Sequence, residues 1–175
     1  GDWYSMTVAN NQLVVANPNA GDIDVASPWT TSVTRLVDMS AQPWPGPTTI
    51  VYHNGNFYVG MLGEFPTKAG RENIYQVTPS GQVSVYATGL TAVTGIGFDS
   101  QNRLYALELS GVSNGPAPFT GQVVRVNASG APTTIAKGLM FPTAMTFGPD
   151  GNIYVSNFGD MGPGAGQVVR VSVPK

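Results

Sequence analysis

The sequence predicts an all-β fold, a β-propeller of four-stranded antiparallel blades, and three observations favour it. First, a short phrase resembling Asn-Ile-Tyr-Val recurs along the chain. Its copies lie at 10–15, 54–59, 101–106 and 151–155. Second, the central residue of each copy recurs at intervals of 44, 47 and 49 residues, a period typical of strand-rich propeller blades. Those equivalent residues are Val14, Tyr58, Tyr105 and Tyr154. Third, the segments between them alternate in polarity, are β-branched or aromatic, and carry no helical period.

Each repeat is expected to form one blade, whose strands we letter A to D in chain order. Strand A precedes the repeated phrase and is predicted at 4–8, 48–52, 93–98 and 143–147. Strand B is the phrase itself. The turn between them carries Asn54-Gly55 or Asp150-Gly151, which supply the positive φ that a tight hairpin needs.

Strands C and D complete each blade. Strand C is predicted at 22–25, 74–77, 122–127 and 167–171, after a B–C loop that is long and rich in Gly and Pro in the third repeat. Strand D is predicted at 33–37, 83–87 and 132–136. Turns containing Ser-Gly, such as Ser80-Gly81, join C to D in the second and third repeats.

The repeats divide one domain, residues 1–175, into blades at approximately 3–40, 46–88, 92–137 and 142–173. The fourth repeat has no strand D, so about 3.75 blades are present. Two closures stay open: a four-bladed ring with a three-stranded last blade, or an arc completed by another chain or by residues missing from this sequence. An arc would leave apolar blade faces exposed at both ends.

The composition excludes several classes of protein. Charged residues make up 10% of the chain and the net charge is −2, with no cluster of Lys or Arg, so nucleic acid is not an expected partner. Cysteine is absent, which excludes disulfides, thiolate metal sites and cysteine nucleophiles. No apolar run approaches the ~20 residues that a membrane-spanning helix needs.

Several segments resemble the ScyD/ScyE family of propellers, named for the scytonemin biosynthesis cluster. They are 57–66 with its Gly-Glu-Phe-Pro ending, 74–83, 87–91, 138–157 with Gly-Leu-Met-Phe-Pro-Thr, and 164–171. The resemblance implies a secreted protein, extracellular or periplasmic, and a six-bladed propeller of roughly twice this length. This chain would then be its four C-terminal blades. It departs from the family at 17–21 and in the Pro-rich segment 40–47.

Two rows of equivalent positions are expected to face the region where propellers bind ligands. The first, at the start of strand A, comprises Thr48, Thr94 and Thr143, with Tyr4 in the first repeat. Six-bladed calcium-dependent lactonases carry Asn, Asp or Glu there, because calcium needs several oxygen ligands and carboxylate charge. Threonine is a weak neutral ligand, so calcium is only a possible cofactor. These hydroxyls could instead bond neighbouring blades.

The second row, at the end of strand B, comprises Asn17, Glu108 and Asn157, with Met61 in the second repeat. These polar side chains could bind a small polar ligand or a cation at the channel mouth. They could equally tie the B–C loops to the sheet.

Aromatic residues and the single histidine are further candidates. The repeated Tyr residues are expected to pack blades together. Trp29 and Trp44 fall in loops and are candidates for contact with a ligand or partner. His53 lies in an A–B turn, away from the B–C loops, and is interpreted as a turn residue rather than a general base.

The sequence favours a secreted, non-catalytic propeller that binds a partner protein or a small ligand and requires no cofactor. No catalytic set is recognisable, whereas the B–C loops at 62–73, 109–121 and 157–166 differ strongly from one another. Two alternatives stay open. One is a calcium-dependent hydrolase or lactonase of the six-bladed type, and the other is a structural protein that self-assembles through exposed blade edges.

Overall fold

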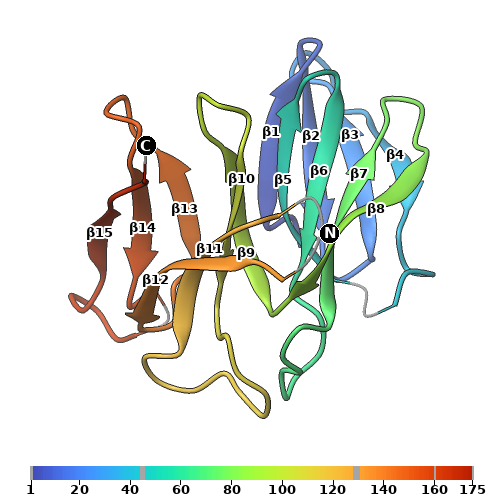
Figure 1. Ribbon diagram of the computed structural model, residues 1–175. Helices are drawn as coiled ribbons and strands as arrows, with labels where there is room; N and C mark the ends of the chain where they lie inside the picture. Colours follow the sequence, from blue (N-terminus) through green and yellow to red (C-terminus); the bar gives the residue numbers. More distant parts are fainter. Residues whose placement is uncertain (1, 44–45, 128–130, 160, 175) are drawn as a thin grey trace.

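The computed structural model describes residues 2–43, 46–127, 131–159 and 161–174, which contain fifteen strands and no helix. The strands form four antiparallel sheets arranged side by side (Figure 1). The predicted all-β class and blade architecture are confirmed. In the described part of the chain, no helix is long and apolar enough to cross a membrane.

Each sheet is one blade, and its strands pair in chain order. The first blade contains β1 (Ser5–Ala9), β2 (Gln12–Asn17), β3 (Asp22–Ala26) and β4 (Val33–Asp38). The second contains β5 (Pro47–His53), β6 (Asn56–Met61), β7 (Glu72–Val77) and β8 (Val83–Leu90). The third contains β9 (Val93–Phe98), β10 (Leu104–Glu108), β11 (Gly121–Arg125) and β12 (Thr133–Leu139). The fourth contains three strands, β13 (Ala144–Phe147), β14 (Ile153–Asn157) and β15 (Gln167–Val171).

The first strands of successive blades lie against one another. Strand β1 contacts β5, β5 contacts β9, and β9 contacts β13. Three clusters of buried apolar side chains fill the three seams between blades. Among the described residues, β1 and β13 share no comparable contact, so the first and last blades form no fourth seam.

The repeated tyrosine packs one blade against the next. The Tyr58 ring meets Phe98 of the following blade edge-on, with ring centroids 4.8 Å apart, and Tyr105 meets Phe147 in the same way at 5.6 Å. Both tyrosines are buried. The interpretation of these residues as seam packing is confirmed, and the geometry is the edge-to-face arrangement that aromatic pairs prefer.

The two outer faces of the arc carry exposed apolar side chains. On β1, Met6 and Val8 are 61% and 65% exposed, whereas Ile50, which occupies the position of Met6 in the second blade, is buried. On β15, Val168 is 76% exposed. Side chains that would fill a seam elsewhere therefore face outward at both ends, which matches the expectation for an open arc.

We expect the repeated tyrosine to contribute more to the free energy of unfolding where it is buried in a seam than where it lies on an outer face. Tyr105→Ala should lower the free energy of unfolding by about 3–5 kcal/mol, because it empties a buried site between two blades. Tyr154→Ala should cost about 1 kcal/mol or less, since this equivalent residue lies on the outer face of the fourth blade, where it is only partly buried. Urea unfolding of both variants measures the difference. Equal losses would contradict the seam role.

Candidate functional site

Glu108 and Asn157 bind the connections that enter their blades. Glu108 Oε1 accepts the Thr91 backbone N–H at 2.8 Å, and Asn157 Oδ1 accepts the Met140 N–H at 2.7 Å. Both side chains are buried. In the same two places, the next residue along the chain donates its own N–H back to the connection. These side chains therefore hold each blade to the segment that joins it to the preceding blade.

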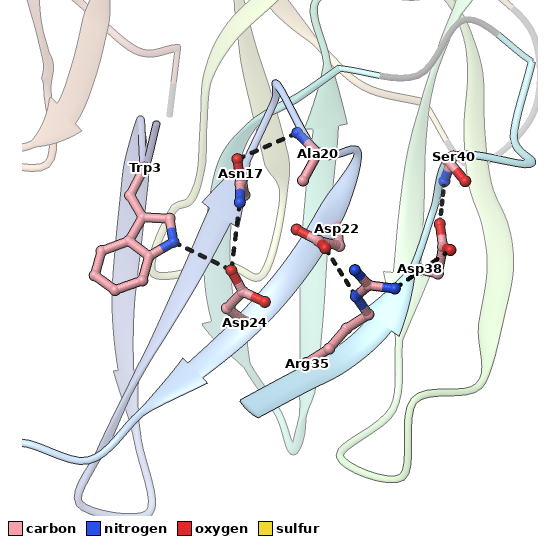
Figure 2. Close-up of polar contacts among 8 residues, drawn as sticks. All are labelled: Trp3, Asn17, Ala20, Asp22, Asp24, Arg35, Asp38 and Ser40. Carbon is pink, nitrogen blue, oxygen red and sulfur yellow. Dashed lines mark hydrogen bonds and ion pairs between the residues drawn. The ribbon is translucent and has the colours of Figure 1, made fainter. Parts of the chain in front are cut away.

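Asn17 occupies the equivalent position in the first blade but has different partners (Figure 2). Its Oδ1 accepts the Ala20 N–H at 3.3 Å, and its Nδ2 donates to Asp24 Oδ2 at 3.5 Å. The indole Nε1–H of Trp3 donates to the same Asp24 oxygen at 3.1 Å. Asn17, Glu108 and Asn157 are thus each used locally, and no hydrogen bond joins one of these described side chains to another.

Asp24 marks a local departure from the repeat. In the other blades the strand C residue in the same register is Tyr75, Val124 or Val169. The first blade therefore carries a carboxylate where its neighbours carry an apolar side chain, and Trp3 and Asn17 both donate hydrogen bonds to it.

A second polar cluster links the outer strands of the first blade (Figure 2). The Arg35 guanidinium lies 2.8 Å from Asp22 Oδ2 and 3.6 Å from Asp38. Hydrogen bonds from Ser40 lower the pKa of Asp38. The buried Oδ1 of Asp22 has no hydrogen-bond partner among the described residues. With its carboxylates held by one arginine, this cluster ties β3 to β4.

The threonine row bridges seams. The Thr48 hydroxyl donates to the Val93 carbonyl of the next blade at 2.6 Å, and Thr94 donates to the Pro142 carbonyl at 3.2 Å. Thr143, in the last blade, donates within its own sheet to Ser156 at 3.4 Å. Ligand binding by this row stays a prediction, but two of its three hydroxyls already serve the contact between blades.

The remaining candidates are placed as follows. Trp29 lies in the turn between β3 and β4 and is highly exposed. Trp44 lies outside the described residues. The His53 ring stacks on Phe98 at a centroid distance of 3.9 Å, and its Nε2 lies 3.0 Å from Asn102 Oδ1. His53 therefore packs against the next blade at the end opposite the B–C loops.

Glu72 is a buried carboxylic acid that sequence reasoning missed. It begins β7, is 4% exposed, and its Oε2 has no hydrogen-bond partner among the described residues. Burial raises its pKa to about 7, while Arg71 opposes the shift and Glu64 adds to it. The signal was present in the repeat, because the residue that begins this segment in the other blades is glycine: Gly21, Gly121 and Gly166.

The B–C loops of the second and third blades are locked together through Thr67. Its backbone donates to the Gly115 carbonyl at 3.0 Å and accepts the Asn114 N–H at 2.8 Å. Its hydroxyl donates to the Val112 carbonyl at 2.6 Å and accepts the Gly115 N–H at 2.9 Å. Four hydrogen bonds through one residue give this edge of the propeller a fixed shape.

A cavity of about 370 Å³ lies between the third blade's B–C loop and β12. Its lining consists of Gly111, Val112, Phe119, Thr120, Gln122, Lys137 and Gly138. The Phe119 ring is 60% exposed although its backbone has φ 60°, a region that bulky residues rarely adopt. Phe158 of the fourth blade, with φ 57°, contacts it edge-on at 6.3 Å between centroids.

Glu108 is connected to this cavity by a row of side chains. It pairs in register with Gln122, which pairs with Lys137 on the outer strand. The Gln122 amide N–H donates to Glu108 Oε2 at 2.6 Å. Burial raises the pKa of Glu108, and the hydrogen bonds from Gln122 and Thr91 oppose that shift. This row of side chains thus runs from the buried carboxyl group of Glu108 to the exposed, basic side chain of Lys137 at the cavity.

A larger cavity, about 600 Å³, lies at the opposite end, between the A–B turns of the third and fourth blades. Its acidic groups have partners. Asp99 pairs with Arg103 at 2.6 Å and Asp150 pairs with Arg170 at 3.0 Å. Hydrogen bonds from Asn152 lower the pKa of Asp150 to about 2. These ion pairs stabilise the turns that carry them.

No set of three His, Cys, Asp or Glu side chains suited to a metal ion occurs within the described ranges. The structure therefore adds no calcium ligands to the candidates named from the sequence, and calcium binding stays a prediction.

Comparison with known proteins shows the fold alone. No protein-family profile matches the chain, and no curated protein sequence matches it. Among solved structures, streptogramin B lyase is 12% identical, with a TM-score of 0.64 over 98% of this chain and 55% of that one. An aldose sugar dehydrogenase from Streptomyces coelicolor, solved with PQQ bound, is 14% identical, with a TM-score of 0.70 over 97% and 60%. A putative gluconolactonase is 11% identical, with a TM-score of 0.60 over 94% and 61%.

These structural relatives are β-propellers, which supports the fold predicted from the repeat. The chain spans only about half to three-fifths of their length. None of the three comparisons identifies the ScyD/ScyE family.

The threonine row yields a test of its role between blades. Thr48→Val should cost about 1–2 kcal/mol of unfolding free energy, because it leaves the buried Val93 carbonyl without its donor across the seam. Thr143→Val is the matched control and should cost about 0.5 kcal/mol or less, since its hydroxyl makes one long bond within a sheet. Chemical denaturation of both variants measures this. Similar losses would contradict a bridging role.

Proposed function

We propose that the protein is a secreted, non-catalytic propeller of the ScyD/ScyE type that binds a small ligand in the cavity beside its third B–C loop. The observation that carries the proposal is Phe119, a bulky apolar residue held exposed at this cavity by a left-handed backbone. Such a conformation costs about 1–3 kcal/mol and is retained where the surroundings enforce it, often at ligand sites.

The rigidity of the surrounding loops supports this proposal. Thr67 fixes the third blade's loop to that of the second blade, and the hydroxyls of Ser110 and Thr120 lie 2.8 Å apart across the loop itself. A cavity whose walls are ordered before binding loses less entropy when a ligand enters. The site is therefore preorganised for a small molecule.

The exposed faces of the first and last blades support the proposal of a partner that completes the ring. They present apolar side chains such as Met6, Val8 and Val168, while the equivalent positions at internal seams are buried or partly buried. Further blades, supplied by another chain or by residues outside this sequence, would cover them. A six-bladed ring of the ScyD/ScyE type would require two more blades.

Ligand-observed NMR with a mixed fragment library tests the binding site. We expect a subset of fragments to contact the wild-type protein and to lose that contact in Phe119→Ala. Phe65→Ala is the matched control, because Phe65 is an exposed phenylalanine in the second blade's B–C loop that does not line the cavity. Hits that persist in Phe119→Ala, or no hits with the folded wild type, would overturn the proposed site.

A second candidate is an enzyme, the calcium-dependent hydrolase or lactonase considered from the sequence. Glu72 favours it, since a buried acid with a raised pKa and an unpartnered oxygen is typical of catalytic acids and bases. Similar solved propellers include proteins described as a lyase and as a putative gluconolactonase. A calcium-dependent rise in melting temperature, together with lactone hydrolysis that is lost in Glu72→Gln, would favour this candidate over binding alone.

Glu72 predicts a specific pH dependence of stability. Its pKa is about 7 in the folded protein and 4.5 in the reference state, so the folded state holds the proton more tightly. Stability from this group is therefore full below pH 4.5 and is lost as the pH rises towards 7. Glu72→Gln should be more stable than wild type at pH 8, by on the order of 2 kcal/mol, and similar to it near pH 4.5.

Urea unfolding of both proteins at these two pH values measures the effect. Glu64→Gln is the control, because it removes an exposed carboxylate that contributes the smallest part of the pKa shift of Glu72, so this variant should keep most of the pH dependence of the wild type. An equal difference between wild type and Glu72→Gln at both pH values would contradict the raised pKa.

A further inference from the structure

We propose that the ligand of the third-blade cavity is an acidic sugar, a saccharide that carries a uronate carboxylate. This inference rests on the proposed binding function of the cavity and adds the chemical class of the ligand. Three side chains that line the cavity carry it: Phe119, Lys137 and Gln122.

Phe119 offers the apolar surface. Its ring is largely exposed at the cavity and is braced by the edge-on contact with Phe158. The face of an aromatic ring is electron-rich, so it attracts the weakly positive C–H groups on one face of a sugar ring. A rigid, exposed ring therefore suits a saccharide without demanding that the ligand itself be aromatic.

Lys137 offers the positive charge. It lies on β12, lines the cavity and is exposed. Within the described residues, no carboxylate forms an ion pair with it, whereas Lys68 of the neighbouring loop is held by Glu64 at 2.9 Å. An ammonium group without a carboxylate partner at the mouth of a cavity favours an anionic group on the ligand.

Gln122 offers a hydrogen-bond acceptor with a defined orientation. Its amide N–H donates to Glu108 at 2.6 Å, which turns the side-chain nitrogen towards the buried carboxylate. The side-chain carbonyl then remains to accept a hydroxyl proton, because no described residue donates to it. Gly111 makes room for this arrangement, since a Cβ there would overlap the Gln122 amide.

The three groups together select one class. A neutral sugar would pack on the Phe119 ring and donate to the Gln122 amide, but it would leave the Lys137 ammonium without an anionic partner. An aromatic acid would contact the ring and the ammonium, but it has no hydroxyl to donate to Gln122. A uronate satisfies all three, through a C–H face, a carboxylate and ring hydroxyls. The cavity volume of about 370 Å³ is within the range of small-molecule sites and accommodates one sugar ring.

Titration calorimetry with galacturonate, galactose and benzoate tests the inference on the wild-type chain. Galacturonate should bind about fivefold more tightly than galactose, from one exposed charge-assisted bond, and should weaken as salt is raised. Galacturonate should also bind more tightly than benzoate, which lacks the hydroxyl that Gln122 would accept.

Three variants separate the contributions. Lys137→Gln should bring galacturonate down to the affinity of galactose, and Phe119→Ala should weaken both sugars at least tenfold. Lys68→Gln, the matched loss of a lysine outside the cavity, should leave both unchanged. Circular dichroism and melting temperature confirm that each variant is folded.

The remaining outcomes each overturn a different statement. If benzoate bound as tightly as galacturonate, the inference that the ligand is a sugar would be wrong, and an aromatic acid would be the better candidate. Fragments that depend on Phe119, with no binding of any of the three probes, would overturn the acidic-sugar class and leave the binding site standing. No Phe119-dependent binding of any compound would overturn the proposed function as well.

Discussion

The seam between successive blades is the contact on which the rest of this structure depends. Each seam joins the first strands of two neighbouring blades and is filled by apolar side chains such as Tyr105 and Phe147. In the second and third seams, polar groups then fix the register, through a threonine hydroxyl on one side and the Glu108 or Asn157 oxygen on the other. No single blade could bury both of its faces, so the sheets are stable only as neighbours.

The seams also determine where the chain can vary. Because strands A and B are largely committed to packing, chemical variety is concentrated in the B–C loops, at the end of strand B and in strand C. Glu72 and Phe119 both lie there, one replacing a repeated glycine and the other held in an unfavourable backbone region. The B–C loops of the second and third blades also fix each other's shape through Thr67.

The repeat was sufficient to predict the fold, the blades and the packing role of Tyr58 and Tyr105, because periodicity reports directly on equivalent backbone positions. It also placed Glu108, with Asn17 and Asn157, at the end of strand B as a candidate for ligand binding or for tying the loops to the sheet. It could not show that Glu108 accepts a backbone N–H from the preceding connection, since that bond joins residues of different repeats. The cavity depends on the backbone conformation of Phe119, which no side-chain pattern encodes.

The pairing of Trp3 with Asp24 has a consequence for assembly. Every internal seam has two unlike sides. One side contributes a strand C residue, which is Tyr75, Val124 or Val169 in turn, and the other contributes the central residue of the repeated phrase, which is Val14, Tyr58 or Tyr105. Blades can therefore join in only one direction, back to front. At the front of the first blade the matching position is Asp24, whose shorter hydrogen bond comes from the Trp3 indole, so a joining blade must either accommodate Trp3 or bring a donor in its place. This requirement makes the surface selective, because a blade with only apolar side chains would not meet it.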